Sequence, residues 1–249
     1  IYYLAGQSSV GLSFEQPAES LESIVSGVLN ILEVIRIQKK SIKLYNAGSS
    51  ECFGDTGGVA ATECTPFLPR SPYAVAKSSA HWLVRNYRES YGLYACTGIL
   101  FNHESPLRPY RFVTQKIIQT AARIAMGSDE KLPLGRLDIQ RDWGWAPEYV
   151  DAMWRMLQQE TPSDILIATG HSHRLDKFVQ VAFQYHGLDW EKYVTVSPEL
   201  FRPSDIAYSG GDPSLAAKIL NWSAAVNLNQ LVALMNVDCI DNEIKKSSP

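Results

Sequence analysis

The chain is predicted to form an α/β fold: a doubly wound parallel sheet of Rossmann type, with its N-terminal strands missing, and a smaller C-terminal α/β part. Two observations predict it. Short apolar runs typical of buried strands alternate with longer segments whose apolar residues recur at helical spacing. One strand, at residues 42–47, delivers two hydroxyls and a carboxylate to its C-terminal end. Hydrophobic residues make up 45% of the 249 residues, enough for a sizeable core.

The first hundred residues alternate strands with helices. The elements expected here are, in order, a strand at 1–4, a turn at 5–8, a helix at 19–39, a strand at 42–47, a helix at 72–91 and a strand at 94–101. The long helix at 19–39 is inferred from apolar residues that cover a broad face. Small residues in the turn after the first strand let the backbone approach a ligand.

The composition shifts after residue 104, which predicts a domain boundary there. The elements expected beyond it are a helix at 112–126, a short strand at 131–134, a loop at 141–144, a helix at 147–159, a strand at 165–168, a polar loop around 171–173, a helix at 175–185, a helix led by residues 212–214, a last helix at 228–237 and a frayed tail at 242–249.

Charge and cysteine usage exclude several classes of protein. The net charge is −3 without a basic run, so nucleic acid is not expected as a main partner. No stretch approaches the ~18 unbroken apolar residues of a membrane span. The four cysteines form neither a C-x-x-C motif nor a ligand cluster with the five histidines. We therefore expect no metal, reduced thiols and a cytoplasmic location.

The most informative pattern joins a strand end to a helix. Ser49, Ser50 and Glu51 follow the strand at 42–47, and Tyr73 and Lys77 share one face of the helix that comes after a proline-rich loop. A lysine ammonium beside a tyrosine favours the phenolate. Together with a hydroxyl, the pair forms a base that can deprotonate an alcohol while a nicotinamide takes the hydride, and Glu51 adds a second base. Tyr-x-x-x-Lys alone is weak among 12 tyrosines, so the prediction rests on the joint pattern.

These residues and further motifs along almost the whole chain resemble the extended short-chain dehydrogenase/reductase superfamily and, within it, the GDP-mannose 4,6-dehydratase family. The matching segments are 4–8, 10–15, 49–51, 69–77, 86–92, 98–106, 112–114, 116–117, 141–144, 201–203 and 211–213. The chain departs from the family at Ser49, where threonine is usual, and in the loop at 107–110. A glycine-rich strand–turn–helix for pyrophosphate is not found among the 249 residues. The resemblance implies that it lies upstream of Ile1, so we expect N-terminal sequence to be missing.

The resemblance implies a role for each matched residue. The catalytic residues are Ser49, Glu51, Tyr73 and Lys77. The cofactor, NADP, is expected to contact Leu4, Ala5, Gly6, Ser8, Tyr73, Lys77, His103 and Arg108. The nucleotide sugar is expected to contact Ser8, Ser50, Asn102, Lys116, Arg141, Arg202 and Asp205. Arginine and lysine suit this role because a diphosphate needs cationic donors.

The activity that the resemblance implies is dehydration of GDP-D-mannose to GDP-4-dehydro-6-deoxy-D-mannose with internally recycled NADP. Residues 1–104 would then be the remaining part of the NAD(P)-binding domain with the catalytic residues. Residues 105–249 would mainly bind the nucleotide sugar, with segments near 145–170 returning to the first domain. A homodimer or homotetramer is expected, paired through the helices at 19–39 and 72–91.

Two alternatives remain open. One is an NAD(P)-dependent reductase or epimerase that acts on another nucleotide sugar, since such enzymes keep the tyrosine and lysine but do not need Glu51. The other is a non-catalytic homologue that lacks the cofactor site.

Overall fold

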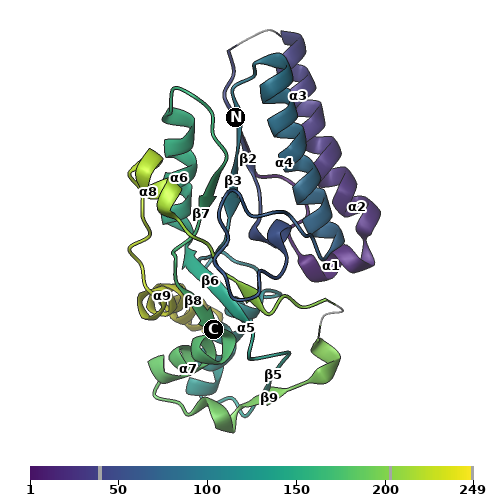
Figure 1. The fold of residues 1–249 in the computed structure, drawn as a ribbon. Coiled ribbons are helices and arrows are strands. Elements are labelled where there is room, and N and C mark those ends of the chain that lie inside the picture. Colours follow the sequence, from purple (N-terminus) through teal and green to yellow (C-terminus); the bar gives the residue numbers. More distant parts are fainter. Residues whose placement is uncertain (39–40, 202–203, 248–249) are drawn as a thin grey trace.

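The computed structural model describes residues 1–38, 41–201 and 204–247, with side chains up to Val237. It has the predicted α/β fold, and Figure 1 shows a parallel sheet in its upper part with helices on both faces. The strands of this sheet are, in spatial order, β1 (Tyr2–Tyr3), β2 (Leu44–Ala47), β3 (Ala95–Leu100) and β7 (Ile165–Ile167). All three pairings are parallel, so their carboxyl ends meet at one edge.

Helices cover the two faces of this sheet. The helices are α3 (Gly27–Gln38) and α4 (Pro72–Tyr91) on one face and α6 (Ala146–Gln158) and α8 (Ser214–Leu220) on the other. Successive strand residues point to opposite faces. Leu44 therefore belongs to the core cluster under α3 and α4, while Tyr45 belongs to the cluster under α6. This arrangement makes the sheet doubly wound.

Helix α4 has clear sequence signals at both ends. The Ser71 hydroxyl accepts a hydrogen bond from the backbone N–H of Ala74 at 3.1 Å and caps the N-terminus, and Pro72 occupies the first helical turn. Gly92 ends the helix in the left-handed conformation, with φ of 65°. These ends fix α4 over the sheet, and thereby the residues that it carries toward the edge.

The single helix expected at 19–39 is wrong in detail. The structure has α2 (Pro17–Leu21), a π-helical turn (Glu22–Ser26) and then α3, with Lys39 outside the described residues; α1 (Val10–Glu15) was not predicted. The Tyr3 hydroxyl donates to the carbonyl oxygen of Ser23 at 2.8 Å and lies where a Cβ at Gly27 would be. The Tyr3 side chain therefore packs directly against the π-helical turn, where Gly27 leaves room for it.

A second sheet lies below the first. Its strands are β10 (Tyr208–Ser209), β6 (Gln140–Trp145) and β4 (Asn102–Glu104), with β8 (Ser172–Arg174) antiparallel to β6. The loops predicted at 141–144 and around 171–173 are therefore wrong. The charged residues of β6 gave this strand the sequence pattern of a loop. In the structure Asp142 is fully buried, and its carboxylate accepts hydrogen bonds from the backbone N–H groups of Thr169 and Gly170.

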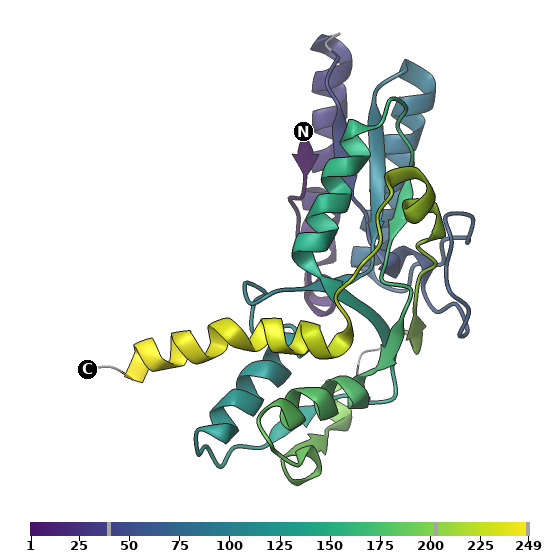
Figure 2. The same cartoon turned by 90° about the vertical axis from the view of Figure 1, so that its left-hand side faces the viewer.

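The lower part is completed by three helices and a two-stranded sheet. These elements are α5 (Val113–Ala125), α7 (Leu175–Tyr185), α9 (Leu228–Ser247), β5 (Leu132–Leu134) and β9 (Val194–Val196), with 3₁₀ turns at Trp190–Lys192 and Pro198–Leu200. Their core includes Ile117, Phe178 and Leu231. The last helix was predicted to end at residue 237, but α9 continues to Ser247 and projects from the body in Figure 2. Much of the predicted tail is thus helical, and residues 248–249 lie outside the described part.

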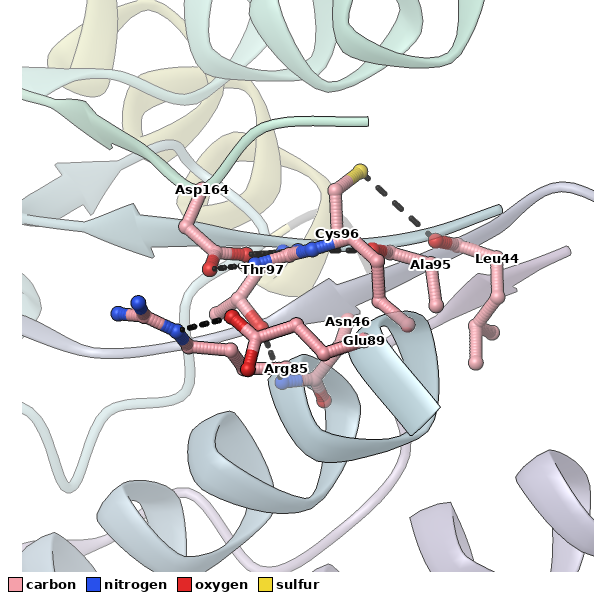
Figure 3. A network of polar contacts seen from close by, with 9 residues as sticks. Leu44, Asn46, Arg85, Glu89, Ala95, Cys96, Thr97 and Asp164 are labelled. Carbon is pink, nitrogen blue, oxygen red and sulfur yellow. Dashed lines mark hydrogen bonds and ion pairs between the residues drawn. The ribbon is translucent and has the colours of Figure 1, made fainter. Parts of the chain in front are cut away.

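A polar network fastens β7 and β3 to α4 (Figure 3). Arg88 donates to both carboxylate oxygens of Asp164, at 2.9 and 2.6 Å, and to the carbonyl oxygen of Ala95. Asp164 also accepts from the backbone N–H of Thr97 at 2.8 Å.

Among residues 1–38, 41–201 and 204–247, no helix is long and apolar enough to cross a bilayer.

Candidate active site

A cavity of about 610 Å³ lies where the carboxyl ends of β2 and β3 meet the lower part of the molecule. This is the edge at which α/β proteins bind ligands, and the volume suits a small-molecule substrate. The predicted site residues that line it are Ser8, Ser49, Ser50, Glu51, Tyr73, Asn102, His103, Arg108, Lys116, Arg141 and Asp205. Residues from both sides of the expected boundary near 104 therefore share one cavity.

Ser49, Glu51 and Tyr73 lie together on the wall beneath the upper sheet. Gly48 precedes them, and a Cβ there would come within 2.7 Å of the Thr97 side chain, so only glycine fits beside β3. Ser49 is extended, and its hydroxyl accepts from the backbone N–H of Glu51 at 3.3 Å, which opens a 3₁₀ turn. The Ser49 hydroxyl also hydrogen-bonds to Tyr73. The strand end thus presents the Ser49 and Ser50 hydroxyls and the Glu51 carboxylate to the same cavity.

The surroundings of Tyr73 and Lys77 are both strongly desolvating. Burial raises the pKa of Tyr73 well above its usual value, while the Ser49 hydrogen bond and, more weakly, the charge of Arg108 act to lower this pKa. Lys77 lies outside the cavity lining, with Nζ 5.8 Å from the centre of the Tyr73 ring. This ammonium donates to the carbonyl oxygen of Ala47 at 2.9 Å, and burial lowers the Lys77 pKa to about 8. The Tyr73 phenol is therefore protonated at neutral pH.

Strand β4 brings His103 to the cavity, and the loop that follows it brings Arg108. The His103 ring stacks on Tyr149 with centroids 5.0 Å apart, and its Nδ1 lies 2.8 Å from the carbonyl oxygen of Phe101. Burial lowers the pKa of His103, so the ring is neutral at pH 7. Nδ1 must carry the proton to donate to Phe101, which leaves Nε2 as a hydrogen-bond acceptor. Arg108 donates to the carbonyl oxygen of His103 at 3.1 Å.

Several cations also line the cavity. Lys116 on α5 donates to the carbonyl oxygen of Pro133 at 2.8 Å, and the buried Arg141 on β6 donates to that of Gln140 at 2.8 Å. Arg111 and Arg136 also line the cavity, although the sequence patterns did not single them out. These cations suit a phosphate-bearing ligand.

Some predicted residues are not brought into the cavity. Leu4, Ala5 and Gly6 lie exposed at the carboxyl end of β1 and outside its lining, and Arg202 lies outside the described residues. Glu104 was missed, although it is fully buried and lines the cavity beside His103. Its signal in the sequence was its position in the polar run that ends a buried strand.

The arrangement is suited to acid–base chemistry on an anionic ligand that carries an alcohol. Two separate proton-transfer groups, Tyr73 and Glu51, line the same cavity as several cations. Within the part of the chain that the structure describes, no three histidine, cysteine or acidic side chains come together as a metal site.

Comparison with known proteins supports the family resemblance that the sequence motifs indicated. Residues 1–235 match the sequence profile of the family described as GDP-mannose 4,6 dehydratase. The chain is 47% identical over 239 residues to GDP-mannose 4,6 dehydratase 2 of Arabidopsis thaliana, which covers 94% of this chain and 64% of that protein. It is 42% identical over 269 residues to the Drosophila melanogaster GDP-mannose 4,6 dehydratase, covering 100% of this chain and 67% of the relative. The chain spans 64–66% of the length of the two Arabidopsis relatives.

Solved structures with low sequence identity share the fold. The structure of RMD from Pseudomonas aeruginosa complexed with NADPH superposes with a TM-score of 0.88 at 20% identity, covering 97% of this chain and 81% of that one. UDP-glucose 4-epimerase of Thermotoga maritima with UDP-glucose gives 0.86 at 21% identity, covering 98% and 77%. With a profile match over residues 1–235 and more than 40% identity to curated members, the chain belongs to the GDP-mannose 4,6 dehydratase family.

Proposed function

We propose that the protein dehydrates GDP-D-mannose to GDP-4-dehydro-6-deoxy-D-mannose, with NADP recycled inside the site. Family membership supports this activity, since the relatives carry that name. The observation that carries the proposal is the shared cavity wall of Ser49, Glu51 and Tyr73. A redox-neutral dehydration needs two proton abstractions, and this wall offers a separate base for each.

The nucleotide sugar would lie in the cavity, with its diphosphate beside the cations that line it. Lys116 and Arg141 are the proposed phosphate contacts, because both are held by backbone carbonyls at the cavity lining. The remaining proposed substrate contacts are Ser8, Ser50, Asn102, Arg202 and Asp205. In this proposal residues 1–104 serve mainly the cofactor side and residues 105–249 mainly the sugar-nucleotide side.

The cofactor side has donor and acceptor groups that fit a nicotinamide dinucleotide. Ser8 provides a hydroxyl, Arg108 a fixed cation, and the neutral His103 an acceptor at Nε2. Leu4, Ala5 and Gly6 follow β1 at the same edge of the sheet, where backbone can approach a ligand. When bound, the nicotinamide supplies a reversible hydride acceptor. We propose NADP rather than NAD.

The protein's own groups would move the protons. Tyr73, hydrogen-bonded to Ser49, acts as a base in its phenolate form, so the phenol must first lose its own proton. The phenolate takes the proton from the O4 hydroxyl of the sugar, and the Lys77 ammonium one helical turn along α4 stabilises the phenolate charge. Oxidation at C4 acidifies the C5–H bond. Glu51 removes that proton and returns one to the C6 hydroxyl, which leaves as water.

Assembly and location complete the proposal. Large apolar side chains are exposed on α3 and α4, namely Val34, Ile37, Val75, Trp82 and Tyr91. We propose that these helices pair two copies into a homodimer, or two such pairs into a homotetramer. Sedimentation should then show a species larger than a monomer at micromolar concentration, and a monomer alone would contradict the pairing. The proposed cytoplasmic location rests on the cysteine pattern of the sequence.

A substrate panel tests the activity. The purified protein and NADP are incubated with one nucleotide sugar at a time, either GDP-mannose or another nucleotide sugar. The masses of the products are measured by mass spectrometry. The proposal predicts loss of one water from GDP-mannose without net formation of NADPH. Consumption of NADPH in a parallel incubation with the reduced cofactor would instead indicate a reductase, and an unchanged mass with inverted stereochemistry would indicate an epimerase.

A further inference from the structure

Glu104 is a buried carboxylate at the cavity that the proposed proton transfers do not use. It ends β4, and its side chain is 1% exposed. One carboxylate oxygen, Oε2, lies 2.9 Å from Nε of Arg108 and accepts a hydrogen bond of 2.7 Å from the Thr114 hydroxyl. The carboxylate therefore joins three segments that meet at the cavity: strand β4, the loop at 105–112 and the first turn of α5.

The contacts of Arg108 show what this carboxylate holds in place. The guanidinium lies 4.0 Å from the centre of the Phe112 ring, and its Nη1 donates to the carbonyl oxygen of His103. With the Glu104 contact at Nε, three neighbours fix a side chain that is otherwise long and flexible. The guanidinium still lines the cavity and is 22% exposed. A fixed, partly exposed cation is ready to meet an anionic group without loss of side-chain entropy.

Structural stability alone gives little reason to bury a carboxylate here. Replacing a buried ion pair with apolar residues of similar volume is often neutral or stabilising. The neighbouring Phe112 and Tyr149 rings show that apolar packing is available at this wall. The burial of this carboxylate is better explained if the Glu104–Arg108 pair holds a ligand group.

We propose that Glu104 is a positioning residue: it fixes the Arg108 guanidinium at the cavity wall so that Arg108 can bind an anionic group of the dinucleotide cofactor. This inference rests on the proposed function in so far as it takes the anion to be that cofactor. Thr114 contributes by fixing the same carboxylate oxygen from α5.

A double-mutant cycle with NADPH as the probe tests the proposal. The dissociation constant for NADPH is measured by fluorescence at pH 8 for the wild type, Glu104→Gln, Arg108→Gln and the double variant. Each single change should weaken NADPH binding about tenfold, in the range of one charge-assisted hydrogen bond. The double variant should be no weaker than Arg108→Gln, because Glu104 acts only through Arg108. Binding of GDP, measured in parallel by calorimetry, should change less than about twofold.

Two further variants keep the test decisive. Glu63 accepts a hydrogen bond from the backbone N–H of Leu166 at 2.8 Å and does not line the cavity, so Glu63→Gln should leave NADPH binding unchanged. If Glu104→Gln fails to fold, Thr114→Val takes its place. It should weaken NADPH binding several-fold in the wild type and have no effect in the Arg108→Gln background.

Three results would overturn the proposal: losses that add in the double variant, normal binding by Glu104→Gln, or a wild type that does not bind NADPH. The cycle contains no sugar nucleotide. Coupled losses in a protein that fails to dehydrate GDP-mannose would therefore refute the proposed function and leave the role of Glu104 standing.

Discussion

Burial of Glu104 predicts an unusual pH dependence of stability. Desolvation raises the pKa of this carboxyl from 4.5 to about 7, against the opposing effects of the Arg108 charge and the Thr114 hydrogen bond. The folded state therefore binds a proton more tightly than the unfolded state does. Stability is highest when the group is protonated and falls as pH rises from about 4.5 through 7, which is opposite to the usual behaviour of a paired carboxylate.

The size of this effect follows from the shift. Each pKa unit corresponds to about 1.4 kcal/mol, so full ionisation costs the fold about 3 kcal/mol, of which about 2–3 kcal/mol falls between pH 5 and pH 8. Glu104→Gln removes the titration. The stability of the wild type relative to this variant should therefore decrease by about 2–3 kcal/mol over that pH range.

Urea unfolding at pH 5, 6, 7 and 8 measures this difference directly. Arg108→Gln provides the matched comparison: it removes the cation that lowers the Glu104 pKa, so the loss of stability should become larger and extend to higher pH. Two other titratable groups lie near Glu104. Burial lowers the pKa of His103, and its titration is common to the wild type and Glu104→Gln, so it cancels to first order in their difference. The pKa of Tyr149 on α6 is raised well above its usual value, so Tyr149 stays neutral throughout. Parallel pH profiles for the wild type and Glu104→Gln would refute the reasoning, as would a wild type that gains relative stability toward pH 8.

Three further changes test other parts of the structure. Glu51→Gln should keep substrate binding but lose solvent exchange at C5 and slow dehydration by about 10²–10⁴-fold, and normal dehydration would show that the assigned role is wrong. Gly98→Ala should lower the unfolding free energy by about 1–3 kcal/mol because the new Cβ would lie 2.3 Å from the buried hydroxyl of Tyr45. At Gly11 a new Cβ would lie 4.0 Å from the Ser9 hydroxyl, so Gly11→Ala should not destabilise. Asp164→Ala should cost about 3 kcal/mol because it leaves a half-buried guanidinium unpaired, while Glu89→Ala breaks only an exposed pair and should cost under about 1 kcal/mol; equal costs would contradict this ranking.

The upper sheet was predictable because its strands and helices differ in the period of their apolar residues. The strands at 44–47, 95–100 and 165–167 are almost unbroken apolar runs, and each is buried on both faces. Strand β6 escaped prediction because it carries Arg141 and Asp142 at buried positions. Its burial is made possible by hydrogen bonds from residues 169–170, and such partners are visible only once the chain has folded.

Some residues of the candidate site were likewise predictable from the sequence, and others were not. Ser49 and Glu51 stand at a strand end and Tyr73 at the start of a helix, so local pattern was enough to single them out. Glu104 lies in the polar run that ends a buried strand, but its role could not be predicted from that position, because its environment comes from Arg108 and Thr114 in segments that meet only in three dimensions. The raised pKa of Tyr73 could not be predicted from the sequence either, because burial outweighs the effect of the neighbouring charges.

The central claim is that one hydride leaves the substrate and returns to it within a single site. GDP-mannose deuterated at C4 tests this directly when the product is examined by NMR and mass spectrometry. The proposed dehydration predicts deuterium at C6 of GDP-4-dehydro-6-deoxy-D-mannose and no net change in the amount of NADPH. Deuterium recovered in free reduced cofactor, or lost to solvent with hydrogen at C6, would contradict it.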